Sequence, residues 1–387
     1  MVKKFSEFLK IENTIISQPE VFDTDSYSPS DEEIVERGET SKLYNEIAKF
    51  VKYGIPNNIL LIGPPGTGKT VILNNIRSEL AKRPDFDVRH VNCSDKTPQV
   101  ILSLINGGNI DGQMPENKLK NMFLNGLNNN CLIILDEVDK GLNLKSLLFF
   151  LSRPREQLQI FSHSISVILV SNDPNWDNSL DISVRSSLQL RRVSFERYSK
   201  GQLCNILKLR AKAGFKYDTN IQSTLLSLIA AEVADKYNGD CRVAIKALLY
   251  AAQNAENLRK SAIEESDVTR AFPKALDDIA RSKLSRLSNR DFLVLFSIEE
   301  SKEKTTDAIY KTFLDLIHQG LNVEKIKPTM FYYVLNYLDT HGLIKRKLDI
   351  EKIKDAPPRR IVRVSGNIDK KILEEELNNR MLKLSNR

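Results

Sequence analysis

The sequence is poor in cysteine and contains no long apolar run. Its four cysteines lie far apart and form no Cys-x-x-Cys pair, so we expect neither a disulfide framework nor a zinc site. No stretch approaches the ~18 consecutive apolar residues that a membrane-spanning helix requires. The first residues also lack the apolar core of a secretory signal. We therefore expect a protein of the reducing cytoplasm that has no membrane partner.

Internal repeats and low-complexity tracts are also absent, so a chain of 387 residues suggests two or three ordinary domains. The net charge of +7 is compatible with a nucleic-acid partner but does not require one. This charge is unevenly distributed along the chain. Residues 20–39 are acidic and contain one basic residue, Arg37, whereas basic residues predominate between 345 and 363.

A phosphate-binding loop is the most specific motif in the chain. The apolar run 58–62 leads into a glycine-rich loop, which gives the order strand, loop and helix. The glycines allow a tight turn whose N–H groups point at the phosphates of a nucleotide. Lys69 would reach the terminal phosphates, and the Thr70 hydroxyl would bind Mg²⁺. The predicted nucleotide-binding residues of the loop are Gly63, Pro64, Pro65, Gly66, Thr67, Gly68, Lys69 and Thr70.

Polar side chains that follow two other apolar runs supply the second half of this site. Asp136 and Glu137 follow the run 131–135, and Asn172 follows the run 165–170. Asp136 is suited to bind Mg²⁺ and Glu137 to polarise the attacking water, because phosphoryl transfer depends on positioning and charge neutralisation. Asn172 could hold that water or sense the γ-phosphate, although asparagine in such a place also caps turns.

The order of the elements predicts an α/β core. Helical patterns cover residues 33–53, 71–80, 97–105 and 116–127. Between them lie strand patterns at 58–62, 86–91, 131–135, 165–170 and 188–195. Strands that alternate with helices are typical of a doubly wound parallel sheet.

Two further modules follow the predicted sheet. The first is an all-helical lid with helices at 200–212, 221–236, 242–258 and 265–281. The second has the outline of a winged helix, with helices at 291–300, 305–318 and 328–341 and strands at 342–349 and 359–364. The predicted domains are therefore an N-terminal arm (1–30), an ATPase core (31–195), a helical lid (196–285) and a winged helix (286–387).

Taken together, the loop, Asp136-Glu137, Asn172 and the helical lid resemble the AAA+ ATPases. Within that superfamily the chain is similar to the archaeal origin-recognition-type initiators, which are relatives of the large subunit of the eukaryotic origin recognition complex and of its licensing helicase loader. The segments that carry this resemblance are 57–61, 91–93, 135–139, 195–210 and 239–244.

The resemblance implies roles for further residues. Arg242 matches the sensor arginine of the lid, which points at the γ-phosphate, and Tyr198 and Arg210 match lid residues that complete the nucleotide pocket. Members also carry a helical element that touches DNA, and here it falls within 107–127, with Lys118 and Lys120 as possible contacts. One position departs from the pattern: the family usually has arginine before Val184, where this chain has Ser183. Arg185 follows two residues later, so an arginine finger that acts on a neighbouring subunit is in doubt.

The winged helix predicts a DNA-binding surface. Its third helix would enter the major groove, and its hairpin would touch the backbone or the minor groove. Phe331, Val334, Leu335 and Leu338 have helical spacing and should face the core. The alternative is a winged helix used for protein contacts, with its charges simply solvated. The predicted DNA-binding residues are Thr329, Tyr332, Tyr333, Asn336, Lys345, Arg346, Lys347, Arg359, Arg360 and Arg363.

These features predict an initiator that binds ATP or ADP with Mg²⁺, binds duplex DNA at a replication origin and acts in loading a helicase of the minichromosome maintenance type. Hydrolysis would be slow and act as a switch, and the protein would be associated with the nucleoid. One rival is a clamp-loader or branch-migration motor, which needs a well-placed arginine finger. The other is a nucleotide-gated transcription regulator, which would use the same site and the same winged helix.

Overall fold

The computed structural model describes residues 15–24, 26–108, 114–153, 163–217, 219, 221–318, 321–340, 342–349, 359–364 and 368–385. The chain forms two compact units, Met1–Val268 and Thr269–Arg387. No helix in these described ranges is both long and apolar enough to cross a membrane. The bounds of the four predicted domains stay predictions.

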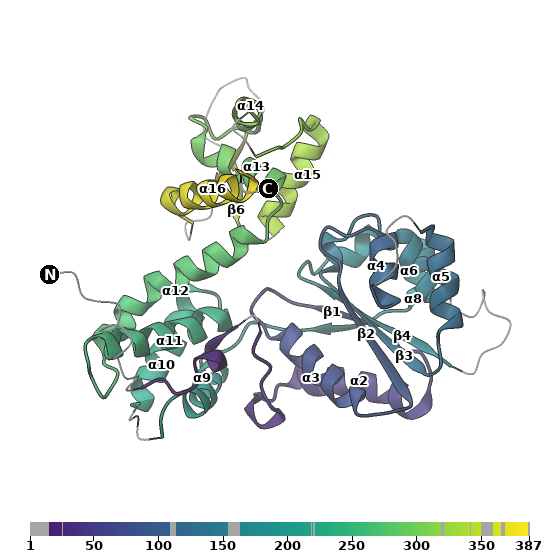
Figure 1. Ribbon diagram of the computed structural model, residues 1–387, viewed down its shortest axis with the longest axis horizontal. Coiled ribbons are helices and arrows are strands. Elements are labelled where there is room, and N and C mark those ends of the chain that lie inside the picture. Colours follow the sequence, from purple (N-terminus) through teal and green to yellow (C-terminus); the bar gives the residue numbers. More distant parts are fainter. Residues whose placement is uncertain are drawn as a thin grey trace. The chain divides into compact units, whose positions relative to one another are not determined.

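A five-stranded parallel sheet lies in the first unit, with helices on both of its faces (Figure 1). Its strands lie in the order β2-β3-β4-β1-β5, which confirms the predicted doubly wound sheet. The carboxyl ends of parallel strands meet at one edge of such a sheet, and ligands bind there. The strands are β1 (Ile59–Ile62), β2 (Phe86–Asn92), β3 (Asn130–Asp136), β4 (Ile165–Ser171) and β5 (Arg191–Ser194).

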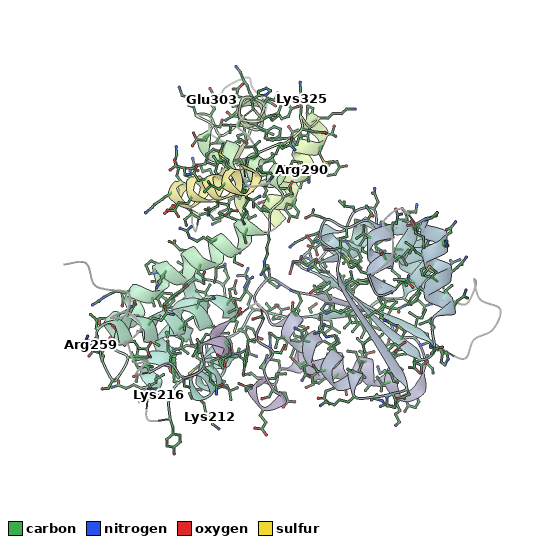
Figure 2. All side chains as sticks on the ribbon, in the orientation of Figure 1. Lys212, Lys216, Arg259, Arg290, Glu303 and Lys325 are labelled. Carbon is green, nitrogen blue, oxygen red and sulfur yellow. The ribbon has the colours of Figure 1, made fainter. Side chains whose placement is uncertain are left out.

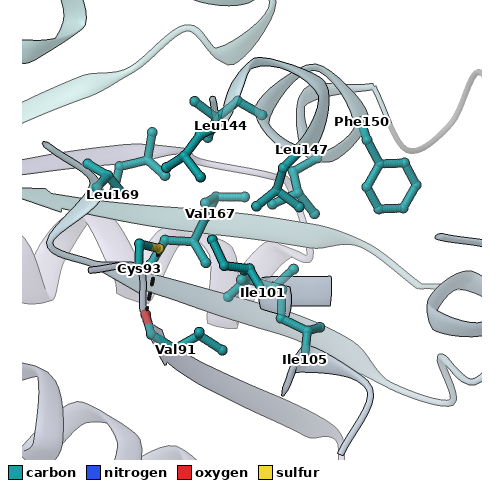
Figure 3. Packing of buried hydrophobic residues seen from close by; sticks show 14 of the residues in the cluster. Val91, Cys93, Ile101, Ile105, Leu144, Leu147, Phe150, Val167 and Leu169 are labelled. Carbon is teal, nitrogen blue, oxygen red and sulfur yellow. Dashed lines mark hydrogen bonds between the residues drawn. The ribbon is translucent and has the colours of Figure 1, made fainter. Parts of the chain in front are cut away.

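Alternate residues of the central strands pack on opposite faces of the sheet. Ile133 and Val167 belong to a core shared with α4 (Pro98–Ile105), α5 (Glu116–Asn125), α6 (Lys145–Ser152) and α8 (Ile182–Leu188). Figure 3 shows this core, in which Val167 lies among Ile101, Leu144 and Leu147. Leu132 and Ile168 belong to the opposite core, which they share with α2 (Gly38–Tyr53) and α3 (Lys69–Ala81). Burial on both faces explains why these strands read as continuous apolar runs.

Helix α2 begins later than the sequence predicted. A short 3-10 turn, η2 (Asp31–Glu33), precedes it, and Arg37 has extended backbone angles, with φ −139° and ψ 152°. The first residues of the predicted helix, 33–37, therefore lie outside α2. Two further 3-10 turns, η3 (Val138–Lys140) and η4 (Trp176–Ser179), follow β3 and β4.

The lid contains the four predicted helices. Two of them begin at side-chain caps: Ser199 and Gln202 form a capping box at the start of α9, and the Asp240 carboxylate accepts the Arg242 N–H at the start of α11. Such caps satisfy N–H groups that have no partner within the helix. The helices are α9 (Lys200–Gly214), α10 (Ser223–Lys236), α11 (Cys241–Asn257) and α12 (Glu265–Ser285).

The N-terminal segment, residues 15–24, packs on the lid. The N–H groups of Ile15 and Ile16 donate to Oε1 of Glu256 at 2.8 and 2.9 Å. Phe22, in the turn η1 (Pro19–Phe22), stacks on Phe215 with the ring centroids 5.0 Å apart. The predicted arm or linker thus contains a packed portion, although its sequence has no clear period.

In the described part of the second unit, three helices that come after α12 are followed by an antiparallel hairpin, an arrangement consistent with the predicted winged helix. The predicted core residues Phe331, Val334, Leu335 and Leu338 are all buried. The helices are α13 (Asn289–Glu300), α14 (Thr306–Leu316) and α15 (Pro328–Thr340), and the strands are β6 (Ile344–Asp349) and β7 (Arg359–Val364).

A further helix, α16 (Lys370–Ser385), was not predicted. Its buried Arg380 donates to the carbonyl oxygens of Leu284 at 2.6 Å and Leu287 at 2.9 Å, and its guanidinium lies over the ring of Phe292. Carbonyls at the C-terminal end of a helix lack partners within that helix. Arg380 therefore fastens α16 to the end of α12.

Candidate functional site

Three strand ends bring the predicted nucleotide-binding residues together. The phosphate loop leaves β1 after Ile62, which is paired with Ser171 at the end of β4. Asn172 therefore follows the adjacent strand end, and Asp136 ends β3, the next strand. This placement is the strand-end edge at which open α/β sheets bind their ligands.

Lys69 connects the loop to the end of β4. Its ammonium donates to the carbonyl oxygens of Gly63 at 2.5 Å and Pro64 at 3.0 Å, and to Oδ1 of Asn172 at 3.0 Å. Burial lowers the pKa of Lys69 to about 8, and the nearby carboxylate of Asp136 opposes this shift. The positive charge of Arg242 lowers the same pKa further.

Two glycines of the loop allow the lid to approach closely. Gly66 and Gly68 have φ of +78° and +85°, in the left-handed region that favours glycine. A Cβ on Gly68 would overlap the hydroxyl of Tyr198, and one on Gly66 would overlap the carboxylate of Asp240. Tyr198, predicted to complete the nucleotide pocket, is therefore placed directly against the phosphate loop.

Asp136 and Glu137 lie at the end of β3 as predicted. Oδ1 of Asp136 accepts the Glu137 N–H at 2.8 Å, and Glu137 has a left-handed φ of +55°. The Glu137 carboxylate is held on both sides, by Nζ of Lys140 at 2.6 Å and by Nδ2 of Asn92 at 3.1 Å. Sequence reasoning missed both of these partners.

The residues predicted to hold the metal have suitable chemistry. Thr70 offers an exposed hydroxyl in the first turn of α3, and Asp136 offers a carboxylate at the strand end. Mg²⁺ prefers oxygen ligands and usually keeps several waters. This donor set therefore fits Mg²⁺ better than a metal that selects thiolates.

Arg242 and Asp240 form a tight pair at the start of α11. Nε of Arg242 donates to Oδ1 of Asp240 at 3.0 Å, and Nη2 donates to Oδ2 at 2.6 Å. The N–H of Cys241 donates to the carbonyl oxygen of Gly66 at 3.2 Å. The N-terminus of α11 thus rests on the phosphate loop and brings the predicted sensor arginine with it.

Arg210 is buried beneath the N-terminal segment. Its guanidinium donates to the carbonyl oxygen of Val21 at 3.2 Å and lies over the ring of Tyr27, 4.4 Å from the centroid. Desolvation lowers the pKa of Arg210, and nearby groups such as Cys241 oppose this shift. A contact between Arg210 and the nucleotide stays a prediction.

Arg37 is a site residue that sequence reasoning missed. It is buried, and it donates to the carbonyl oxygen of Thr67 in the phosphate loop at 3.1 Å and to that of Glu196 at 2.7 Å. Its guanidinium also lies 4.3 Å from the centroid of the Tyr198 ring. The available signal was charge, because Arg37 is the single basic residue of an acidic segment.

Ser183 and Arg185 lie on helix α8. Successive helical residues turn by about 100°, so Arg185 projects from nearly the opposite side of the helix to Ser183. Arg185 is exposed and donates to Oδ1 of Asn178 at 3.3 Å. It therefore does not occupy the place of the arginine that the family usually carries before Val184.

The predicted DNA-binding face of α15 is exposed. Tyr332 and Tyr333 are 45% and 66% exposed, and Thr329 is exposed as well. The side chain of Asn336 is already engaged, because its Oδ1 accepts Nη1 of Arg346 at 2.6 Å. Nε of Arg346 also donates to Asp339 at 2.8 Å, so this pair ties the hairpin to α15.

The hairpin sets two cations opposite each other. Lys345 pairs with Arg363 across β6 and β7, and both side chains are exposed. Like charges opposite each other destabilise a hairpin, and bound phosphates would relieve that repulsion. The side chains of Lys347, Arg359 and Arg360 lie outside the described part of the chain.

Basic side chains elsewhere show why net charge alone does not locate a DNA-binding surface. Lys212, Lys216 and Arg259 project from the lid (Figure 2). Lys118 on α5 is exposed, whereas Lys120 is paired with Glu116 at 2.6 Å and lies over the ring of Phe150. Paired cations gain less from a phosphate than free ones do.

Two family models match the first unit and the start of the second. Residues 59–191 match the ATPase family associated with various cellular activities (AAA), and residues 204–273 match the Cdc6 AAA+ ATPase-type lid domain. The predicted resemblance to an AAA+ ATPase with this type of lid is therefore confirmed, and such a domain binds nucleotide.

Known proteins resemble the chain over most of its length. It is 28% identical over 293 residues to an ORC1-type DNA replication protein of Methanothermobacter thermautotrophicus, covering 75% of this chain and 78% of that protein. It is 29% identical over 349 residues to another from Pyrococcus horikoshii, covering 84% and 81%. Its fold matches the Aeropyrum pernix ORC1 protein in complex with DNA, with a TM-score of 0.72, 23% identity and coverage of 95% and 98%.

Proposed function

We propose that this chain, an AAA+ protein with a Cdc6-type lid that is similar to ORC1-type DNA replication proteins, is an ATP-dependent initiator. It binds duplex DNA at a replication origin and acts in loading a helicase of the minichromosome maintenance type. Slow ATP hydrolysis serves as a switch, and the protein acts in the cytoplasm in association with the nucleoid.

The observation that carries this proposal is the meeting of α11 with the phosphate loop. The N–H of Cys241 contacts Gly66, and Tyr198 contacts Gly68. A nucleotide bound by the loop would therefore touch the lid as well. The presence or absence of the γ-phosphate can then change how the lid is held, which is the basis of a nucleotide switch.

In this proposal each residue of the site has a separate task. Lys69 gives up the carbonyl oxygens of its own loop and binds the terminal phosphates. Thr70 and Asp136 hold Mg²⁺, which neutralises phosphate charge. Glu137 polarises the attacking water and Asn172 positions it. Arg242 contacts the γ-phosphate from the lid.

The affinity for ATP should fall at alkaline pH. The pKa of Lys69 is lowered to about 8 in the free protein, whereas bound phosphates favour the charged amine and raise that pKa. Binding therefore takes up a proton above pH 8, and affinity should drop by up to about tenfold per pH unit there. Equilibrium titrations between about pH 7 and about pH 9.5 measure this effect. A flat profile would contradict the assigned role of Lys69.

Binding of the full chain to duplex DNA should weaken steeply with salt, because neutralised phosphates release counterions. Replacing both Lys345 and Arg363 with alanine should reduce the slope of log affinity against log salt by up to about two units. Lys370→Ala is the matched control, because this lysine is already neutralised by Glu300 at 2.8 Å. Its slope should stay within about half a unit of the parent value.

Two further results decide between the proposed function and its alternatives. If the chain binds no duplex at ~50 mM salt, where even non-specific contacts are favoured, the second unit is a protein-interaction module. Mapping the genomic sites that the chain occupies separates an initiator from a transcription regulator. Occupancy concentrated at replication origins supports the proposal, and occupancy of promoters away from origins contradicts it.

A further inference from the structure

The carboxylate of Asp240 contacts both the backbone and the side chain of Arg242. It caps α11 by accepting the Arg242 N–H at 3.0 Å. It also holds the guanidinium of Arg242 through two hydrogen bonds, at 3.0 and 2.6 Å. The two side chains are largely buried, with 23% of Arg242 and 17% of Asp240 exposed. A paired, charge-assisted arrangement of this kind is among the stronger hydrogen-bonded contacts in proteins.

This ion pair lies at the nucleotide site. A Cβ on Gly66 would overlap the Asp240 carboxylate, so that carboxylate is packed against the backbone of the phosphate loop. The N–H of Cys241, the residue between Asp240 and Arg242, donates to the carbonyl oxygen of Gly66 at 3.2 Å, so this turn of the lid rests on the loop. The negative carboxylate of Asp240 therefore lies beside the loop that would bind the negatively charged phosphates of a nucleotide.

We propose that Asp240 is a positioning residue that competes with the γ-phosphate for Arg242 and thereby sets the preference between ATP and ADP. The inference rests on the nucleotide site of the proposed function. Without nucleotide, or with ADP, Arg242 stays paired with Asp240. ATP supplies a second anionic partner, and Arg242 moves from the carboxylate to the γ-phosphate. The start of α11 is released from its internal pair at the same moment, so the exchange reports the γ-phosphate to the lid.

The charge of Asp240 should therefore oppose ATP more than ADP. The γ-phosphate, which ADP lacks, must take Arg242 from an existing partner, whereas ADP leaves the pair in place. Removing the charge while keeping the cap isolates this effect, because asparagine and serine cap helices about as well as aspartate. The Asp240→Asn variant therefore tests the competition for Arg242 without removing the cap that stabilises α11.

The experiment measures equilibrium binding of ATP and of ADP by the full chain in the parent, Asp240→Asn, Arg242→Ala and the double variant. We expect Asp240→Asn to tighten ATP binding by about tenfold and to change ADP binding by less than about threefold. In the Arg242→Ala background the same change should leave the ratio of the two affinities unaltered, because the competitor has nothing to compete for. Thermal unfolding without nucleotide checks that the cap is intact, and Asp240→Ser replaces Asp240→Asn if that variant is destabilised.

Three outcomes would overturn the inference. The first is a ratio of ATP to ADP affinity that Asp240→Asn leaves unchanged, and the second is a ratio that shifts toward ADP. The third is an increased preference for ATP that persists when Asp240→Asn is combined with Arg242→Ala. The parent chain separates this failure from a failure of the proposed function. If the parent chain binds both nucleotides, the nucleotide site of the proposed function stands, whatever the result for Asp240. If the parent chain binds neither nucleotide, the proposed nucleotide site itself is contradicted.

Discussion

Replacing Lys69 with alanine should weaken ATP binding by at least about 100-fold, which corresponds to about 3 kcal/mol. The ammonium is buried at the start of α3 and lies among acceptors from the loop and the end of β4. Its loss removes the positive charge that would otherwise meet the terminal phosphates. Titration of the full chain with ATP measures the effect directly.

Lys82→Ala is the matched control for this substitution. Lys82 lies at the other end of the same helix, is mostly exposed and pairs with Glu79. Its loss should leave ATP affinity within about twofold of the parent, because an exposed ion pair contributes little. Nearly normal ATP affinity in Lys69→Ala would show that the loop does not bind the terminal phosphates as proposed.

Glu137→Gln should retain ATP binding and lose turnover by at least about 100-fold. The amide keeps the shape of the carboxylate but cannot polarise the attacking water. Glu137 also lies beyond the loop that binds the phosphates, so affinity should change little. Equilibrium binding of ATP and release of phosphate, measured on the same preparation, separate these two effects.

Lys140→Ala distinguishes the chemical role of Glu137 from a structural one. Lys140 holds the Glu137 carboxylate at 2.6 Å, and its loss leaves that carboxylate in place but less restrained. Turnover should therefore persist in Lys140→Ala while it disappears in Glu137→Gln. If both variants lost turnover equally, the local fold after β3, and not the carboxylate, would be the critical feature.

Local patterns were sufficient to predict the sheet and the centre of the site. The inner strands β1, β3 and β4 are short, largely apolar runs, and the phosphate loop has fixed spacing, so both are visible within a few residues. Parallel pairing then brings Asn172 and Asp136 next to the loop, because the strand ends share one edge. The exposed and buried faces of α15 followed from helical spacing in the same way.

Contacts between distant segments could not be predicted from those patterns. Arg37 donates to the carbonyl oxygens of Thr67 and Glu196, and no sequence pattern around either residue predicts a contact with Arg37. The pair between Asp240 and Arg242 is local, but its position against Gly66 depends on how the lid packs. Helix α16 was missed because it follows the hairpin, where the outline of a winged helix ends.

The packed N-terminal segment has a consequence for how the chain is made. Ile15 and its partner Glu256 are 241 residues apart. At about 5–20 residues per second, the ribosome completes that partner roughly 10–50 s after the segment has been synthesised. During this interval the apolar side chains of Ile15 and Phe22, which are fully buried in the finished protein, do not yet have the complete lid to pack against. The growing chain therefore exposes this apolar segment during synthesis, and the segment can pack only after the lid has been made.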